Sequence, residues 1–322
     1  MIGSQRLRII PVYRQAVLIY NPAAGKIKAA SNRLIGEALQ VLQHAGHVVS
    51  ARPTTGPNTA AALARRGISE GADLILAYGG DGTINEVAQG MLGSSVPLGI
   101  LPGGTANVLA HELGIGARVP AAAALLDEMP SRRISVGRIR IGSEEPRHFL
   151  LMAGVGLDAH IVYRMTAELK EKWGKLAYWI SGFRQLTRRL EEFDVEVDGR
   201  SFRASFALVT KVRNYGGDLE IARRVTLLDD EFELVLFEGS SSLRYLKYFT
   251  GVAVNSLTGM SGVTLLRGRK VRFSAASRGV YAQIDGEHAG RLPAEVEIVP
   301  DALTLLVPEA YAARAAQVTP ER

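Results

Sequence analysis

The chain has 322 residues, of which 47% are hydrophobic and 22% charged, an ordinary composition for a globular protein with room for two domains. Its formal charge of +6 suits anionic partners, such as nucleotide phosphates or acidic lipid headgroups. The lack of cysteine excludes disulfides, thiolate nucleophiles and cysteine-ligated metals, and agrees with a cytoplasmic location. No apolar run reaches about 18 residues, so we expect any membrane contact to be peripheral.

Strand and helix signals alternate through the first third of the chain. The predicted strands are residues 16–20, 47–52, 73–78 and 96–101. The predicted helices cover residues 31–45, 59–67 and 84–92, and a fourth begins near residue 106. This order predicts a parallel sheet that is covered on both faces, and such sheets bind ligands at the carboxyl ends of their strands.

The pattern changes after about residue 134, where short alternating runs predict mainly antiparallel β structure. One long helical stretch, at about residues 158–192, interrupts these runs, and the Ala-rich residues 308–322 predict a terminal helix. We therefore expect two domains. The first is a Rossmann-like α/β nucleotide-binding domain at residues 1–135, to which residues 306–322 return, and the second is a β-sandwich at residues 136–305.

The strongest chemical signal is the turn Gly79-Gly80-Asp81-Gly82-Thr83, between a buried strand and a helix. Glycines let backbone N–H groups approach phosphate oxygens, and a helix N-terminus adds partial positive charge. Asp81 by itself would repel phosphates, so we predict that it orients Mg²⁺ or hydrogen-bonds the nucleotide. The alternative interpretation is a tight turn in which Asp81 caps a helix.

Two further turns have a similar setting. Pro102-Gly103-Gly104-Thr105-Ala106-Asn107 follows the fourth predicted strand, and Thr105 can cap the next helix while it offers a hydroxyl to phosphate. Asn21-Pro22-Ala23-Ala24-Gly25-Lys26 follows the first strand. Alone, each turn is also explained as ordinary turn chemistry, but together they indicate a phosphate-binding edge of the sheet.

These three turns, in order and register, resemble the diacylglycerol kinase catalytic-domain family, which includes bacterial diacylglycerol kinases, sphingosine kinases and ceramide kinases. The first glycine turn also occurs in NAD kinases, but its combination with residues 102–107 and a distal Ile284-Asp285-Gly286-Glu287 is specific. The resemblance spans about residues 16–307 and implies ATP in a cleft between two domains. The implied ATP contacts are Asn21, Pro22, Ala23, Ala24, Gly25, Thr54, Gly79, Gly80, Asp81, Gly82, Thr83, Ile84, Asn85, Gly104, Thr105 and Asn107. Thr54 is assigned by its spacing to Ala60, with Thr55 as the alternative.

The distal carboxylates complete the implied catalytic set. Phosphoryl transfer to a hydroxyl needs in-line positioning, charge neutralisation and a base that accepts the hydroxyl proton. The resemblance implies that Glu287 is this base, and that Asp285 holds it or touches metal. Asp81 of the glycine turn is the third residue of the implied catalytic set. The alternative is a hairpin turn with a solvated glutamate, since Asp-Gly is a strong turn signal.

The resemblance also implies a structural Mg²⁺ away from the active centre. The matching ligands are Asp230 and the backbone carbonyls of Leu227 and Phe232, all hard oxygen donors. Glu231 stands where the family usually has glycine, and this departure puts the ion in question; a solvated acidic turn is the alternative. A second departure is Val108, where many members carry an acid, and it weakens the assignment to diacylglycerol in particular.

The acceptor side is indicated by residues 158–192, where Trp173, Trp179 and several Lys and Arg residues suit a membrane interface. A helix packed on the β domain is the alternative.

The sequence thus predicts an ATP- and Mg²⁺-dependent lipid kinase of phospholipid metabolism, acting on diacylglycerol or a sphingoid or ceramide-like lipid at a membrane surface. A soluble NAD kinase and a non-catalytic nucleotide or lipid sensor remain as alternatives. Nucleic acid is not an expected partner. A homodimer stays open, and neither the acceptor, the regulation nor the assembly can be read from the sequence.

Overall fold

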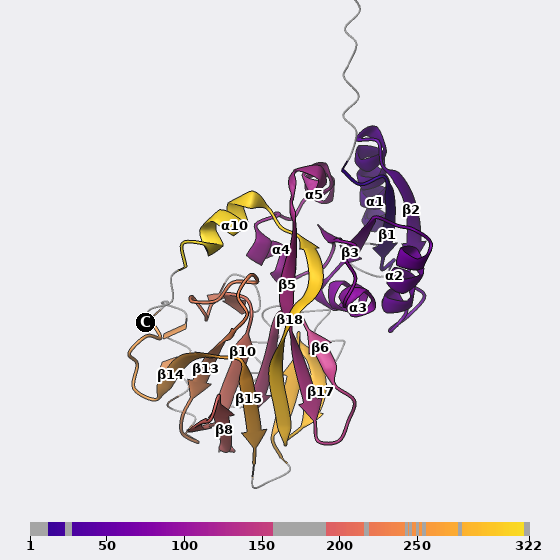
Figure 1. Cartoon of the computed structure of the whole chain (residues 1–322). Coiled ribbons are helices and arrows are strands. Elements are labelled where there is room, and N and C mark those ends of the chain that lie inside the picture. Colours follow the sequence, from indigo (N-terminus) through magenta and orange to yellow (C-terminus); the bar gives the residue numbers. More distant parts are fainter. Residues whose placement is uncertain are drawn as a thin grey trace, which may run out of the picture. The chain divides into compact units, whose positions relative to one another are not determined.

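The chain divides into two compact units in the computed structural model (Figure 1). The structure describes residues 12–22, 28–156, 191–215, 219–241, 244, 247–248, 251–252, 256–275 and 279–318. Unit 1 contains Met1–Arg132 and Leu303–Glu309, and unit 2 contains Arg133–Ala302 and Ala310–Arg322. The chain therefore passes from one unit to the other within β5 (Ser131–Ile141) and returns within β18 (Ala294–Leu306). The C-terminal segment that belongs to unit 1, Leu303–Glu309, is shorter than the predicted segment of residues 306–322.

A parallel sheet forms the centre of unit 1. Its order is β2-β1-β3-β4, with the C-terminal end of β18 beside β4. The first four strands are β1 (Gln15–Tyr20), β2 (Val48–Pro53), β3 (Leu74–Gly79) and β4 (Leu98–Pro102). Strands β3 and β4 are buried along their whole length, whereas the edge strand β2 is mostly exposed. Continuous apolar runs are typical of strands covered on both faces.

Helices connect these strands. They are α1 (Lys28–His44), α2 (Ala60–Ser69), α3 (Asp81–Met91), α4 (Val108–Leu113) and α5 (Val119–Ala124), followed by the 3₁₀ helix η1 (Leu126–Glu128). Helix α1 contacts α5, and α2 contacts α3, as Figure 1 shows. Right-handed crossovers in this strand order place α1 on the opposite face from α2 and α3. The predicted Rossmann-like α/β domain is confirmed.

Two sheets form unit 2. One is antiparallel, in the order β14-β13-β10-β7-β16-β17. Its strands are β7 (Met152–Gly156), β10 (Phe206–Thr210), β13 (Phe232–Phe237), β14 (Val263–Gly268), β16 (Tyr281–Ile284) and β17 (Glu287–Arg291). The other contains β5, β6 (Arg147–Phe149), β8 (Phe193–Val197), β9 (Arg200–Ala204), β15 (Lys270–Ser274) and the first part of β18. A short pair, β11 (Asn214–Tyr215) and β12 (Leu219–Glu220), lies outside both.

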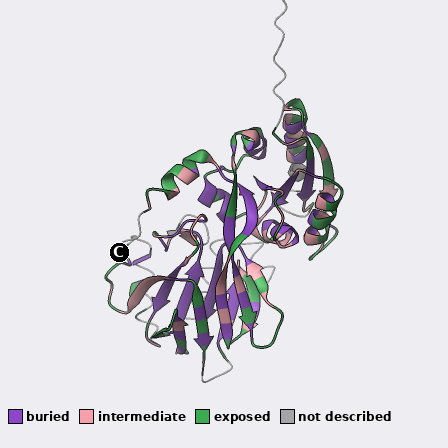
Figure 2. Cartoon of the chain, in the orientation of Figure 1, coloured by how far each residue is buried: buried purple, intermediate pink, exposed green. Residues whose placement is uncertain are grey.

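The core of unit 2 lies between its two sheets. Phe149 and Phe232 stack with ring centroids 5.8 Å apart, and Phe193 meets Phe273 edge-on at 6.1 Å. All four rings belong to one buried cluster. Strands β10 and β13 are buried along their whole length and appear purple in Figure 2. This packing confirms the predicted β-sandwich.

Two remaining predictions concern helices. The C-terminal helix is present as α10 (Glu309–Ala315). The predicted membrane-interface helix at residues 158–192 falls almost entirely on residues outside the described ranges. Within those ranges, no helix has both the length and the apolar character needed to cross a bilayer.

Candidate active site

The two glycine turns of unit 1 touch at the carboxyl ends of β3 and β4. The Gly103 N–H donates to the Gly79 carbonyl at 2.9 Å. A methyl group on Gly104 would lie 2.5 Å from the Gly80 Cα, which is closer than carbon atoms can approach. Because Gly104 cannot carry a side chain at this contact, the backbones of the two predicted phosphate loops pack directly against each other.

Asp81 links these turns through hydrogen bonds. It is the first residue of α3, and its two carboxylate oxygens accept the N–H groups of Val108 and Leu109 at 3.0 and 3.1 Å. Both amides belong to the first turn of α4. The carboxylate therefore caps α4, as the turn-and-cap interpretation of the sequence expected, although it caps the neighbouring helix and not its own.

Asn107 shapes the second turn. Its side-chain oxygen accepts the Gly104 N–H at 2.7 Å, and its amide group donates to the Gly104 carbonyl at 3.0 Å. Its backbone is left-handed, with φ 46°, which asparagine tolerates better than most residues. Asn107 is buried, whereas Thr105 beside it is exposed. Asn107 therefore holds the loop shape, and Thr105 is the residue of this turn that a ligand can reach.

The N-terminus of α3 is the available anion-binding element of this surface. Gly80 precedes the helix in an extended conformation and supplies no side-chain cap. Gly82 is exposed and Thr83 half-buried, so the first-turn amides are accessible. The predicted contact Ile84 is fully buried, and its N–H already donates to the Gly80 carbonyl at 3.0 Å. Asn85 is half-buried, and its side-chain oxygen accepts a bond from Gln89 at 3.1 Å. Unpaired N–H groups at a helix N-terminus bind phosphate.

The other predicted ATP residues follow β1 and β2. The Asn21 N–H donates to the Tyr78 carbonyl at 3.3 Å, and the Thr54 N–H donates to the Tyr20 carbonyl at 2.8 Å. Both residues thus lie at the same end of the sheet as the glycine turns. Thr54 is buried, whereas Thr55 is exposed. The Thr55 N–H donates to the Thr59 hydroxyl at 3.3 Å. Pro22 follows Asn21, but the predicted contacts Ala23, Ala24 and Gly25 lie outside the described residues.

The distal carboxylates of unit 2 have two different environments. Asp285 accepts the N–H groups of Leu150, Leu151 and Met152 at 2.9 to 3.0 Å. Asp285 and Gly286 both have positive φ, 47° and 82°, as a type I′ hairpin turn requires. Glu287 follows as the first residue of β17, and its side chain is 63% exposed. Asp285 therefore fixes the turn, and Glu287 projects from it.

Arg147 lies beside Glu287. Its guanidinium lies 3.9 Å from the Glu287 carboxylate and donates to the His288 carbonyl at 3.3 Å. This contact is long and solvent-exposed, so it orients Glu287 only weakly.

The predicted structural metal loop holds a buried lysine. Asp230 is exposed, and Leu227 and Phe232 are buried. Lys211, which the sequence analysis did not select, is 0% exposed, and burial lowers its pKa to about 8 against the opposing charges of Asp229 and Asp230. Its ammonium donates to Ser135 and to the Asp229 carbonyl. The available sequence signal was a lysine directly after the apolar run of residues 206–210.

A separate hollow of about 870 Å³ lies in unit 2 over β8, β9 and β15. Its rim carries ion pairs, including Arg272 with Glu196 at 3.3 Å and with Glu295 at 2.8 Å. It contains none of the predicted site residues. We interpret it as the solvated outer surface of a twisted sheet.

Comparison with family models gives a match to each unit. Residues 15–139 match the diacylglycerol kinase catalytic domain, and residues 152–307 match the YegS C-terminal NAD kinase β-sandwich-like domain. Two curated relatives are named diacylglycerol kinase. The protein from Bacillus subtilis is 29% identical over 288 residues, covering 88% of this chain and 92% of the relative. The protein from Mycobacterium tuberculosis is 28% identical over 298 residues, covering 88% and 96%.

Solved structures show the same fold. A crystal structure described as a diacylglycerol kinase from Bacillus anthracis superimposes with a TM-score of 0.75, at 22% identity, over 94% of this chain and 99% of that one. A second structure from the same organism gives a TM-score of 0.78 at 21% identity. At these identities the structural likeness supports the two-unit fold and is not by itself a statement about substrate.

Proposed function

We infer that the chain belongs to the diacylglycerol kinase catalytic-domain family of ATP-dependent lipid kinases, and that it transfers the γ-phosphoryl group of ATP to a hydroxyl of diacylglycerol or a related sphingoid or ceramide-like lipid. Both catalytic and β-sandwich regions match, so the proposal rests on the whole chain and not on one motif. Because such acceptors are membrane lipids, the reaction would take place at a membrane surface.

The observation that carries the proposal is the joined pair of glycine turns. Their contact at Gly80 and Gly104 places the second turn directly beside the N-terminus of α3. The Gly103 and Gly104 N–H groups are bonded within the turns, so the first turn of α3 would supply the donors. Asp81 places its negative charge on α4, so the α3 terminus remains available to an anion. A triphosphate has the charge and length to use such a surface.

Mg²⁺ would assist at this surface. Each Asp81 oxygen accepts one N–H group, which leaves lone pairs for a metal. A single carboxylate suits Mg²⁺, which commonly takes one or two protein carboxylates and fills its remaining positions with phosphate oxygens and water. When bound, the ion would neutralise charge that develops on the transferred phosphoryl group.

Glu287 is the proposed base for the acceptor hydroxyl. Its carboxylate is exposed, and its backbone is fixed by the turn that Asp285 braces through three hydrogen bonds. A carboxylate held in this way can accept a proton without moving its own strand. The proposed roles thus divide between the units, with nucleotide binding in unit 1 and proton acceptance in unit 2.

The decisive assay incubates purified protein with radiolabelled ATP and a panel of diacylglycerol, ceramide, sphingosine and NAD. We expect label in one lipid class and none in NAD. Phosphorylation of NAD alone would support the NAD kinase alternative, and ATP binding without transfer to any acceptor would support a non-catalytic sensor.

Glu287→Gln tests the base. We expect turnover to fall by about 10²- to 10⁴-fold, because general base catalysis is lost while the side chain keeps its size. The ATP-induced rise in melting temperature should persist, since the nucleotide loops are unchanged. Glu145→Gln is the matched control, an exposed glutamate elsewhere in unit 2. Wild-type turnover in Glu287→Gln would exclude the assigned role.

A further inference from the structure

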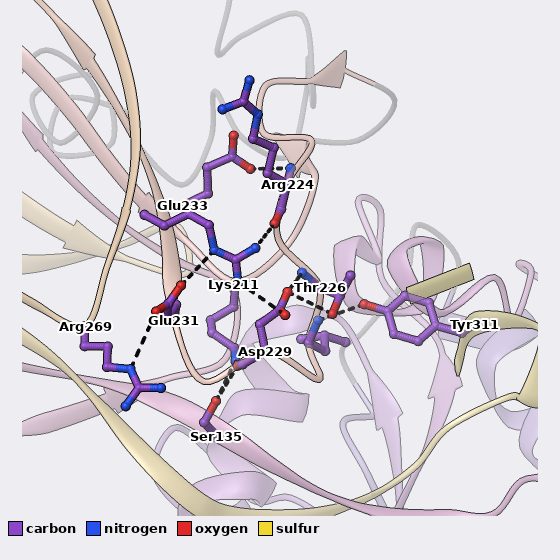
Figure 3. A network of polar contacts seen from close by, with 11 residues as sticks. Ser135, Lys211, Arg224, Thr226, Asp229, Glu231, Glu233, Arg269 and Tyr311 are labelled. Carbon is purple, nitrogen blue, oxygen red and sulfur yellow. Dashed lines mark hydrogen bonds and ion pairs between the residues drawn. The ribbon is translucent and has the colours of Figure 1, made fainter. Parts of the chain in front are cut away.

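The loop of residues 226–232 in unit 2 matches the predicted structural metal site, but a side chain of the protein already binds it. The loop connects to β13, and its central carbonyl, that of Asp229, faces the Lys211 ammonium. Figure 3 shows the Lys211 side chain reaching both Asp229 of the loop and Ser135 of β5. Lys211 directly follows β10. The Ser135 hydroxyl donates to the same carbonyl at 2.8 Å, and Lys211 donates to that hydroxyl at 2.6 Å.

The Asp229 carboxylate and the Leu227 N–H of this loop also have protein partners. The Asp229 carboxylate accepts the Thr226 N–H at 2.7 Å and its hydroxyl at 3.1 Å. The Leu227 N–H donates to the Tyr311 hydroxyl at 2.8 Å. The loop is therefore closed on itself by hydrogen bonds and does not need an ion to bring its ends together.

The charges of the loop are balanced within the chain. Its acidic groups are Asp229, Asp230 and Glu231, and the cations that face them are Lys211, Arg267 and Arg269. Arg267 lies 3.3 Å from Asp229 and 2.9 Å from Glu231, and Arg269 lies 3.7 Å from Glu231.

One more carboxylate lies behind the loop. Glu233 is buried and accepts the N–H groups of Arg223 and Arg224 at 2.8 and 2.7 Å, with the charges of Arg224 and Arg267 nearby. It is thus also satisfied. A divalent ion would add positive charge to a cluster that has already been neutralised, next to the ammonium that holds the Asp229 carbonyl.

We propose that the Lys211 ammonium replaces the structural metal ion of this loop, so that unit 2 folds and remains stable without a divalent cation. Lys211 is fully buried and bound to backbone, so it does not contact substrate and is not a catalytic residue. Glu231, the departure from the usual glycine, belongs to the same replacement, because it supplies the carboxylate that pairs with Arg267 and Arg269. The proposal concerns stability and does not depend on which acceptor the enzyme uses.

The test measures thermal unfolding of the full chain without ATP, in the presence of EDTA and of millimolar Mg²⁺ or Ca²⁺. We expect the wild-type melting temperature to be the same in all three. Lys211→Met should melt about 10 °C lower in EDTA, because it leaves the Asp229 carbonyl and the Ser135 hydroxyl without their charged donor. A divalent ion should then restore part of this loss. Lys270→Met, which removes an exposed lysine of β15, should show neither effect.

Metal content provides a second measurement that does not require Lys211→Met to fold. We expect less than one divalent ion per wild-type chain after dialysis against metal-free buffer, and no change in Asp230→Asn. Ser135→Ala, which removes only one partner of the ammonium, should lower the melting temperature slightly and leave it independent of EDTA. A wild-type chain that is stabilised by Mg²⁺, with the stabilisation lost in Asp230→Asn, would overturn the proposal.

Discussion

Several carboxylates of this protein hold backbone amides, including two that the sequence selected as catalytic. Asp81 accepts two N–H groups, Asp285 accepts three, and Asp198 accepts those of Arg269 and Lys270 at 3.0 and 2.9 Å. Charge-assisted bonds of this kind are stronger than neutral ones, and they fix loops that have no regular ladder. At the residue scale, the aspartate of a glycine turn therefore has a structural role, which is to accept backbone N–H groups, whether or not it also takes part in catalysis.

Asp81→Asn separates these roles. The amide can accept one of the two N–H groups, but its NH₂ would face the other, so we expect the free energy of unfolding to fall by about 2 kcal/mol. Urea unfolding measures the loss. Asp301→Asn is the control, because Asp301 is an exposed residue within β18 whose positive φ asparagine also tolerates. Unchanged stability in Asp81→Asn would show that the carboxylate does not cap α4 in solution.

At the element scale, the proposed nucleotide surface depends on the contact between the two glycine turns. Gly104→Ala would place a methyl group 2.5 Å from the Gly80 Cα and 3.0 Å from the Asn107 side-chain oxygen. The backbone at Gly104 is not left-handed, so the clash alone demands glycine. The turns must separate, and we expect ATP affinity to fall by about tenfold or more, as measured by isothermal titration calorimetry.

Gly36→Ala is the matched control for this substitution. Gly36 lies in α1, and a methyl group there would meet no atom within 4 Å. Alanine should stabilise that helix by up to about 1 kcal/mol and leave ATP affinity unchanged. Equal ATP affinities in the two variants would contradict the shared surface.

The strand-turn-helix order of unit 1 could be predicted because each element carries its own local pattern, but helix starts were less accurate. Periodicity placed the start of α3 near residue 84, whereas the helix begins at Asp81, since its first turn is polar and exposed. The bonds from Val108 and Leu109 to Asp81 join positions 27 and 28 residues apart, and no local pattern encodes them. The sequence did not indicate a role for Lys211 either, because its partners Ser135 and Asp229 lie in other elements and no local pattern connects them.

At the scale of the whole molecule, unit 1 depends on residues from the far end of the chain. Leu303 and Leu305 of β18 are fully buried, and Leu305 pairs with Leu98 of β4. The Thr304 hydroxyl donates to the Ser94 carbonyl at 3.0 Å, and the Val307 N–H donates to the Pro130 carbonyl at 3.0 Å. The nucleotide-binding unit is therefore complete only when the chain has returned from unit 2.

Leu305→Ala tests this dependence. Removing a fully buried leucine side chain leaves a cavity, and we expect the free energy of unfolding to fall by about 3 kcal/mol. Leu125→Ala, at a leucine of unit 1 that is 40% exposed, should change it by less than about 0.5 kcal/mol. Urea unfolding followed by far-ultraviolet circular dichroism compares the two, and limited proteolysis with and without ATP locates the loss. We expect new cleavage sites in Leu305→Ala to fall in residues 12–132. ATP should protect these sites from the protease, because the ligand binds only the folded unit. Cleavage confined to residues 133–302 would show that unit 1 is stable without the returning strand.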